Sequence, residues 1–251
     1  MTDFKDMMNK VILGDCLKVM EKIPDKKINM ILTDLPYGKT RRNRWDMIIS
    51  LDKLWKEYKR VIINRGVIVL TAAEPFTSIL VMNDIEMFKY DLVWEKRTPV
   101  GHYNVKKMPL RNHETILIFY KELPVYNPQK IEERGVFHKD KIIYSYTDSK
   151  DYGKSKRSYF ISNLDGKYYP RSIIGKFSRD REKLHPTQKP LLLFEYLIKT
   201  YTNEGDLILD SCAGSFTTAV AAINLKRNWI CIDKEKGYCE IGLKRIGQRN
   251  D

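Results

Sequence analysis

The sequence has 251 residues, of which 43% are hydrophobic and 11% aromatic, so it has enough apolar material for a folded core and general disorder is excluded. Lys and Arg number 45 against 32 Asp and Glu, and the resulting net charge of +13 attracts a polyanion such as a nucleic acid. No apolar run approaches the roughly 18 to 20 residues that cross a bilayer, and the mixed, charged N-terminus is unlike a secretory signal. We therefore expect a cytoplasmic protein with no membrane partner. The four cysteines lack zinc-ligand spacing, so no metal site is expected.

The first 120 residues alternate short apolar, β-rich runs with helical patterns. Strands are predicted at 11–14, 28–33, 67–70 and 115–120, and helices at 51–58 and 75–82. Strands separated by helices favour an α/β fold with a parallel, doubly wound sheet.

Residues 121–184 differ in composition, with 15 Lys and Arg, 9 Asp and Glu, 7 of the 15 tyrosines and little apolar periodicity. We expect an inserted, loop-rich region there, with one or two short strands such as 142–146. The α/β pattern then returns, with helices at 191–201 and 217–225, strands at 206–210 and 229–233, and a last helix to about 246. The predicted organisation is thus an α/β part at 1–120, an insertion at 121–184 and a second α/β part at 185–251.

A turn of small residues follows the predicted strand that ends at Asp210. Ala213, Gly214 and Ser215 let the backbone approach a ligand beyond the carboxyl end of the strand. The next strand ends in Asp233, which is well placed to accept both hydroxyls of a ribose. Neither a dinucleotide fingerprint nor a phosphate loop is present, so a ligand with a ribose and no phosphates, such as S-adenosylmethionine, fits better. The alternative is an ordinary strand–turn–helix with small packing residues.

A second polar motif, Asp34-Leu35-Pro36-Tyr37, closes the strand at 28–33. Pro36 favours an extended Leu35, so the Asp34 carboxylate and the Leu35 carbonyl become two acceptors that match the two hydrogens of an aromatic amino group. Such acceptors favour a pyramidal nitrogen whose lone pair can attack a methyl sulfonium. Tyr37 offers a ring on which a flipped-out base can stack. The alternative is a surface turn with a stacking tyrosine.

Together these motifs resemble the amino-group DNA methyltransferases of the permuted branch, often called the β class, in which the target-base motif precedes the cofactor motif. Asp34 to Tyr37 stands where that family carries Asp-Pro-Pro-Tyr, and Asp210 to Thr218 resembles its cofactor loop. The resemblance continues through Gly14-Asp15-Cys16-Leu17, Trp45-Asp46, Trp94-Glu95-Lys96, His113-Glu114-Thr115-Ile116-Leu117 and His185-Pro186-Thr187-Gln188-Lys189-Pro190. Leu35 in place of the first proline and Phe216 in place of the second loop glycine are departures from it.

The resemblance implies a Rossmann-like S-adenosylmethionine-dependent fold and assigns roles to several residues. Asp34, Leu35, Pro36 and Tyr37 would form the catalytic motif. Asp15 would contact the adenine of the cofactor and Asp233 its ribose, and Thr187 and Lys189 would meet its carboxylate. The residues expected around the rest of the cofactor are Cys16, Asp210, Ala213, Gly214, Ser215, Phe216 and Thr217.

Basic residues are expected to hold double-stranded DNA, because a base must leave the duplex to be methylated at its amino group. The candidates are Lys39, Arg41, Arg42 and Arg44 directly after the target motif, and Lys106, Lys107 and Arg111 further along. The 121–184 insertion is expected to read the target sequence. Because the motif begins with Asp, we expect an adenine-N6 methyltransferase of bacterial or phage origin, monomeric or homodimeric. Cytosine-N4 transfer, or a catalytically impaired DNA-binding subunit, remains the alternative.

Overall fold

The computed structural model describes residues 4–38, 49–132, 148–149, 153–154, 167–175, 177, 180, 184 and 188–247. The chain divides into two compact units, one made of Met1–Asn127 and Ser172–Asp251 and the other of Pro128–Arg171. This second unit spans fewer residues than the insertion expected at 121–184. The predicted strand at 142–146 lies outside the described residues.

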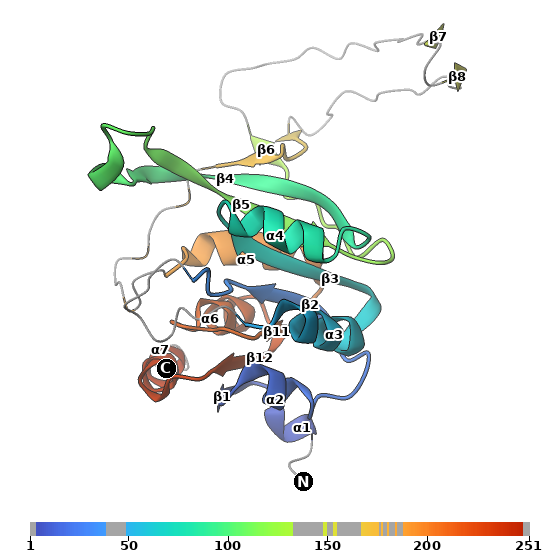
Figure 1. Cartoon of the computed structure of the whole chain (residues 1–251). Coiled ribbons are helices and arrows are strands. Elements are labelled where there is room, and N and C mark those ends of the chain that lie inside the picture. The colour runs from blue at the N-terminus through green and yellow to red at the C-terminus, as the bar shows by residue number, and fades with distance from the viewer. Residues whose placement is uncertain are drawn as a thin grey trace. The chain divides into compact units, whose positions relative to one another are not determined.

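An eight-stranded sheet forms the centre of the larger unit (Figure 1). Its strands, in spatial order, are β1 (Lys10–Leu13), β12 (Asn228–Asp233), β11 (Leu207–Asp210), β2 (Ile28–Thr33), β3 (Ile62–Ala72), β5 (Arg111–Phe119), β4 (Phe88–Val100) and β10 (Ile173–Ile174). All neighbouring pairs are parallel except the two that involve β5, which runs antiparallel to both β3 and β4. The first two strands of the chain, β1 and β2, are therefore separated by the last two, β11 and β12.

Helices cover both faces of this sheet, as expected for a doubly wound fold. The core on one face takes side chains from α1 (Phe4–Met7), α2 (Cys16–Met20), α3 (Leu51–Val61) and α4 (Phe76–Asn83). The core on the other face takes them from α5 (Leu191–Tyr201), α6 (Thr217–Asn224) and α7 (Lys236–Gly247). In β2, Ile31 belongs to the first core and its neighbours Met30 and Leu32 to the second, and all three are fully buried. A strand that is covered on both faces reads as a continuous apolar run, which is why this segment was predictable.

Several elements were not predicted from the sequence. The longest is β4, whose residues Phe88–Val100 alternate between charged and apolar side chains and include a proline. It forms a hairpin with β5, and the connection holds a short 3-10 helix, η1 (His102–Asn104). Figure 1 shows this hairpin, in green, extending beyond the other strands of the sheet. The short elements α1, α2 and β10 were also missed.

The smaller unit has little regular structure among its described residues. β6 (Ile131–Glu132) pairs with β9 (Lys167–Tyr168), and β7 (Asp148–Ser149) pairs with β8 (Gly153–Lys154), both antiparallel. Lys130 lies over the ring of Tyr169, with its Nζ atom 5.2 Å from the ring centroid. The short strands agree with a loop-rich segment.

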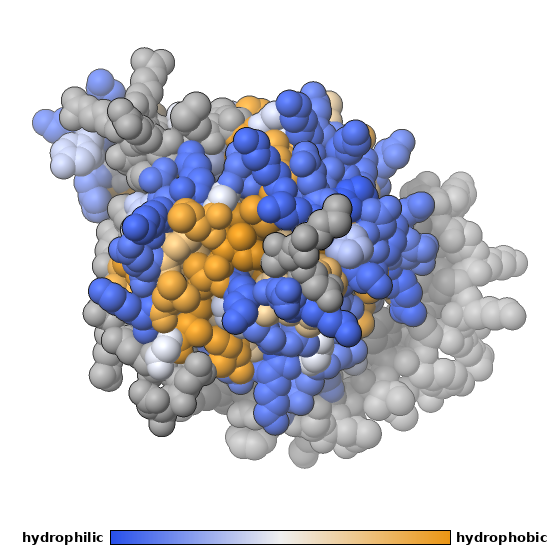
Figure 2. All heavy atoms as spheres, turned by 90° about the horizontal axis from the view of Figure 1, so that it is seen from below, coloured by the Kyte–Doolittle hydropathy of each residue, from blue (hydrophilic) through white to orange (hydrophobic). Residues whose placement is uncertain are grey.

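β1 is an edge strand of the sheet. Figure 2, which views the molecule from this end, shows an apolar area bordered by hydrophilic residues. Leu13 of β1 and Leu243 of α7 are large apolar side chains that remain 53% and 58% exposed. None of the helices in the described part of the chain is long and apolar enough to cross a membrane.

Candidate active site

Four aspartates stand where adjacent strands of the sheet end. Asp15 comes shortly after β1, Asp233 ends β12, Asp210 ends β11 and Asp34 follows β2. Because these strands are parallel neighbours, their carboxyl ends share one edge of the sheet. Ligands of open α/β sheets bind at this edge. The topology therefore brings the predicted target motif and the predicted cofactor motif together, although they are far apart in the sequence.

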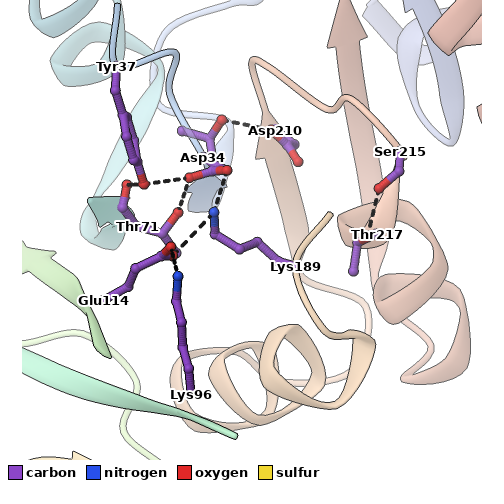
Figure 3. Close-up of polar contacts among 10 residues, drawn as sticks. Asp34, Tyr37, Thr71, Lys96, Glu114, Lys189, Asp210, Ser215 and Thr217 are labelled. Carbon is purple, nitrogen blue, oxygen red and sulfur yellow. Dashed lines mark hydrogen bonds and ion pairs between the residues drawn. The ribbon is translucent and has the colours of Figure 1, made fainter. Parts of the chain in front are cut away.

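Asp210 links the two motifs directly. Its Oδ1 atom accepts hydrogen bonds from Thr33 Oγ1, at 2.8 Å, and from the main-chain N of Cys212, at 3.1 Å. Its Oδ2 atom accepts a hydrogen bond from Thr218 Oγ1. Burial raises the pKa of Asp210 to about 6 even though these donors favour the charged form. Thr33 immediately precedes Asp34, so the Thr33–Asp210 bond fixes the distance between the end of β2 and the end of β11 (Figure 3).

The Asp34 carboxylate has three hydrogen-bond donors. Tyr37 Oη and Thr71 Oγ1 donate to Oδ1 at 2.9 and 2.5 Å, and Lys189 Nζ donates to Oδ2 at 2.6 Å. Burial, followed by the charge of Asp34, raises the pKa of Tyr37 well above its ordinary value, so the phenol remains a neutral donor. These contacts hold the carboxylate in one orientation at the end of β2 (Figure 3).

The other residues of the target motif differ in how deeply their side chains are buried. The Leu35 side chain is 3% exposed and packs in the core with α3 and α4, so its main chain alone can face a ligand. Pro36 is half-buried. The Tyr37 ring lies 5.3 Å from the ring of Phe76, at an interplanar angle of 36°. The leucine that replaces the family's proline thus contributes to the core.

Lys189, expected to be a partner of the cofactor carboxylate, pairs with two carboxylates of the protein itself. Its side chain is 8% exposed, and besides Asp34 its Nζ atom lies 3.3 Å from Glu114 Oε2. Lys96 forms an ion pair with the other Glu114 oxygen, Oε1. Burial lowers the pKa of Lys189, but Asp34 and Glu114 raise it more, so that it lies above its ordinary value.

Thr71, Lys96 and Glu114 were not selected as site residues from the sequence. Lys96 and Glu114 lie in segments that resemble the family, but no role was attached to either of them. The available signal for Glu114 was a charged residue directly before the apolar run 115–120, which was predicted to be a buried strand. Glu114 is on β5, next to Trp94 of β4, and Thr71 is near the end of β3.

The predicted cofactor turn begins with well-defined main-chain contacts. Ala213 N donates to Ile232 O at 2.9 Å, and Gly214 N donates to Asp233 Oδ2 at 2.8 Å. Asp233 Oδ1 accepts a hydrogen bond from Glu235 N at 2.8 Å. Burial raises the pKa of Asp233. Each Asp233 oxygen keeps a second lone pair for a hydroxyl donor.

Arg245, which was not predicted as a site residue, binds the end of the turn at Ser215 and Thr217. Arg245 of α7 donates to Ser215 O at 2.7 Å and to Thr217 Oγ1 at 2.9 Å, and its other terminal nitrogen lies 2.9 Å from Asp180 Oδ2. Asp180 Oδ1 also accepts from Leu191 N at the start of α5. Arg245 thus joins α7, the turn and the segment that carries Lys189.

Phe216 is the second departure from the family pattern. It adopts a left-handed conformation with φ of 58° and is fully buried. Its ring packs against Gly242 of α7 so closely that an added Cβ on Gly242 would lie 2.4 Å from the ring. The phenyl group is thus packed away from the turn, and only the main chain of Phe216 can contact a ligand.

Asp15 and Cys16 lie at the start of α2. Asp15 Oδ1 caps this helix by accepting from Leu17 N at 2.9 Å and Lys18 N at 3.2 Å, and Asp15 is exposed. The Cys16 side chain is hydrogen-bonded to Cys212, and this bond is the main cause of the lowered pKa of Cys16. The opening motif therefore touches the cofactor turn through a pair of thiols.

The predicted DNA-binding residues are only partly described. Thr187, Lys39, Arg41, Arg42 and Arg44 lie outside the described residues. Lys106, Lys107 and Arg111 are exposed and lie at the tip of the β4–β5 hairpin. The pairing of that hairpin includes Glu114 of the site, which lies opposite Trp94, and continues to the pair Val100 and Arg111. Within the described residues, no group of His, Cys, Asp and Glu is arranged to hold a metal ion.

Comparisons with known proteins show the fold and the family of this chain. The DNA adenine methyltransferase YhdJ of Escherichia coli strain K12 is 28% identical over 262 residues, which cover 98% of this chain and 85% of YhdJ. The fold is shared with the crystal structure of the M1.HpyAVI–SAM complex, with a TM-score of 0.63, 24% identity and coverage of 94% and 98% of the two chains. It is also shared with the cytosine-N4-specific PvuII DNA methyltransferase, with a TM-score of 0.69, 18% identity and coverage of 96% and 87%. The family model for DNA methylases of the N6/N4 type matches residues 28–244, and the chain belongs to this family.

Proposed function

We infer that the protein transfers the methyl group of S-adenosylmethionine to the N6 amino group of an adenine at a specific site in double-stranded DNA. Family membership supports DNA as the substrate. The name of YhdJ and the Asp that begins the target motif support adenine as the base. The observation that carries the proposal is the Thr33–Asp210 hydrogen bond of 2.8 Å, because it joins the motif for an amino group to the motif for a ribose-bearing cofactor.

The cofactor site is formed by the turn after β11 and the ends of its neighbouring strands. Asp233 would accept the ribose hydroxyls with the lone pairs left free by Gly214 and Glu235. Asp15 would contact the adenine of the cofactor. The turn itself, built from Asp210, Ala213, Gly214, Ser215 and Thr217, with the main chain of Phe216, would surround the methionine part. Cys16, Thr187 and Lys189 complete the proposed set. Lys189 would meet the cofactor carboxylate from its place beside Asp34 and Glu114.

The target site is formed by Asp34 and the main chain of Leu35. When bound, the cofactor supplies a methyl group on a positively charged sulfur. The amino nitrogen would bond to that methyl carbon as the C–S bond breaks with its electron pair on sulfur, and the proton lost by the nitrogen would pass to solvent. Asp34, held by Tyr37 and Thr71, would accept an amino hydrogen and face the positive charge that develops on nitrogen. Tyr37 would stack on the flipped base.

DNA would approach along the β4–β5 hairpin. Its tip carries Lys106, Lys107 and Arg111 and extends past the carboxyl edge at which Asp34 lies. These exposed cations would neutralise phosphates beside the flipped nucleotide. We assign phosphate contacts also to Lys39, Arg41, Arg42 and Arg44, and reading of the target sequence to the 121–184 insertion. The protein would act as a monomer or homodimer in the cytoplasm of a bacterium or of a phage host.

The decisive experiment is expression in a host without DNA methylation, followed by modification-sensitive sequencing of its DNA. N6-methyladenine at one sequence motif is the expected result, and it also gives the recognition site. Detection of N4-methylcytosine would instead show that the protein performs the same chemistry on cytosine. Unmodified DNA from a host containing folded, cofactor-binding protein would contradict the proposal and favour a catalytically impaired DNA-binding subunit. Light scattering of the purified protein decides between monomer and homodimer.

A further inference from the structure

The Asp34 carboxylate has a cationic partner that competes with its proposed substrate. Lys189 Nζ lies 2.6 Å from Oδ2, while the two neutral hydroxyls of Tyr37 and Thr71 already occupy Oδ1. Hydrogen bonds from a charged donor are stronger than those from a neutral amino group. An amino nitrogen that becomes positive during methyl transfer would moreover share one oxygen with an ammonium group. Lys189 therefore opposes the reaction while it remains on Asp34.

Lys189 cannot simply move into water. Its side chain is 8% exposed, and a buried ammonium group needs an opposite charge to remain ionised. Glu114 provides such a charge, with Oε2 at 3.3 Å from Nζ. Oε2 is buried, and its contact with Nζ is longer than the 2.6 Å contact that Nζ makes with Asp34. A second position for the ammonium group, with a closer contact to Glu114, therefore lies next to the first.

Glu114 is itself held in place from the opposite side. Lys96 of β4 pairs with Oε1, so that Asp34, Lys189, Glu114 and Lys96 form a row of alternating charges (Figure 3). Burial raises the pKa of Glu114, but Lys189 and Lys96 lower it more, and it lies below its ordinary value. Glu114 therefore stays ionised and can hold Lys189.

We propose that Glu114 is a positioning residue: it takes over the Lys189 ammonium group when the target amino group enters, and so leaves Asp34 Oδ2 free to accept that amino group. This inference rests on the proposed function. With Lys189 on Glu114, the negative charge of Asp34 faces the nitrogen as its bond to the methyl carbon forms and the C–S bond breaks. Glu114 contacts neither reactant and acts through Lys189.

The test is the variant Glu114→Gln, which keeps the shape of the side chain and removes its charge. Lys189 then stays on Asp34, and kcat on duplex DNA falls by roughly 10- to 100-fold, the range for a lost positioned group at a reacting centre. The affinity for S-adenosylmethionine, measured by calorimetry, stays within about threefold of the wild type because Asp233 and the turn are unchanged. Normal cofactor binding also shows that the variant is folded.

The pH dependence separates this role from a structural one. Among the described residues, the charged and titratable groups around Lys189 are Asp34, Glu114, Tyr37, Lys96 and, beyond Asp34, Asp210. Removing the Glu114 charge removes one cause of the raised pKa of Lys189, so Lys189 loses its proton at a lower pH in the variant. Asp34 is then released, and kcat of Glu114→Gln recovers towards the wild-type value as the pH rises.

Two further variants complete the test. Lys96→Met removes the ion pair on Glu114 Oε1 but leaves the Glu114 charge, so its kcat is expected to fall by less than that of Glu114→Gln. Glu114→Asp keeps the charge on a shorter side chain and is expected to restore part of the rate. A rate for Glu114→Gln equal to the wild type at every pH, or a pH-independent loss matched by Lys96→Met, overturns the inference. Failure of the wild-type protein to methylate DNA contradicts the proposed function instead.

Discussion

The aspartates at the carboxyl edge of the sheet differ in their surroundings, and this difference separates their tasks. Asp210 is 2% exposed, and its oxygens accept hydrogen bonds from Thr33, Thr218 and the main-chain N of Cys212. Asp34 is only half-buried and is paired with Lys189. Asp210 is therefore suited to fixing the geometry of the edge, and Asp34 to meeting a reactant.

Asp34→Ala is expected to lower the methylation rate by at least about 100-fold, because the acceptor for the amino group is removed. Cofactor affinity is expected to stay near the wild-type value, since Lys189 retains Glu114 as a counter-charge. Transfer of labelled methyl groups to DNA and calorimetric titration measure the two quantities. A variant that still turns over within a few-fold of the wild type would remove Asp34 from the mechanism.

Asp210→Asn is expected to change the pH dependence of stability. The pKa of Asp210 is raised from 3.8 to about 6 by burial, so the unfolded chain releases this proton at a lower pH than the folded chain. Folding stability from this group is thus lost as pH rises through that window, and above it the loss is constant. The asparagine has no such loss and can still bond Thr33 and Thr218. Its advantage over the wild type in unfolding free energy should be about 1 kcal/mol larger near pH 7.5 than near pH 5, as measured in urea. An equal difference in unfolding free energy at both pH values would contradict a raised pKa of the Asp210 carboxyl group.

At the scale of elements, the cofactor turn depends on α7. Arg245 of this helix binds Ser215 and Thr217, and Gly242 leaves the space that the Phe216 ring fills. The bulky residue in a turn of small ones is tolerated because Gly242 of α7 leaves room for its ring. The pair Phe216 and Gly242 therefore acts as one packing unit.

Gly242→Ala is expected to destabilise the protein by about 1 to 3 kcal/mol, because the added methyl group would overlap the Phe216 ring. Gly237→Ala, on the same helix, is the matched control: a Cβ there meets nothing within 4 Å. It should be neutral or stabilise by up to about 1 kcal/mol, as glycine disfavours helix. Thermal unfolding of the two variants gives the comparison, and equal melting temperatures would count against the close packing of Phe216.

The sequence was informative where one physical signal dominated. The buried strands β2, β11 and β12 are short apolar runs, and they were placed within one residue of their observed bounds. β4 was missed because its alternating charged and apolar side chains, with Pro99 near its end, lack such a run. The direction of the Phe216 ring depends on its contact with Gly242, and Lys189 pairs with Glu114. The residues of each pair are far apart in the sequence, so no local pattern predicts these contacts.

At the scale of the molecule, the positive charge is useful only if it faces the DNA. The hairpin residues Lys106 and Lys107 project from the carboxyl edge of the sheet, near the site. Lys26 and Lys27 are equally exposed but directly precede β2, and so lie at the opposite edge. The two pairs therefore have the same charge and opposite locations.

Replacing Lys106 and Lys107 by alanine is expected to weaken DNA binding and to reduce the slope of log affinity against log salt concentration by about 1 to 2, through fewer released counterions. The same change at Lys26 and Lys27 should leave the slope nearly unchanged. Fluorescence anisotropy with labelled duplex at several salt concentrations measures both. Equal slopes for the two double variants would place the DNA elsewhere.

The strand order has a consequence for biosynthesis. β1 and β2 are made first, but the strands that belong between them, β11 and β12, are made last. Until translation reaches about residue 233, the nascent chain exposes two strand edges whose hydrogen-bonding groups have no neighbour, and such edges invite aggregation. A chain released before β12 is made therefore exposes these edges, and a chain that stops before residue 213 also lacks the turn proposed to bind the cofactor.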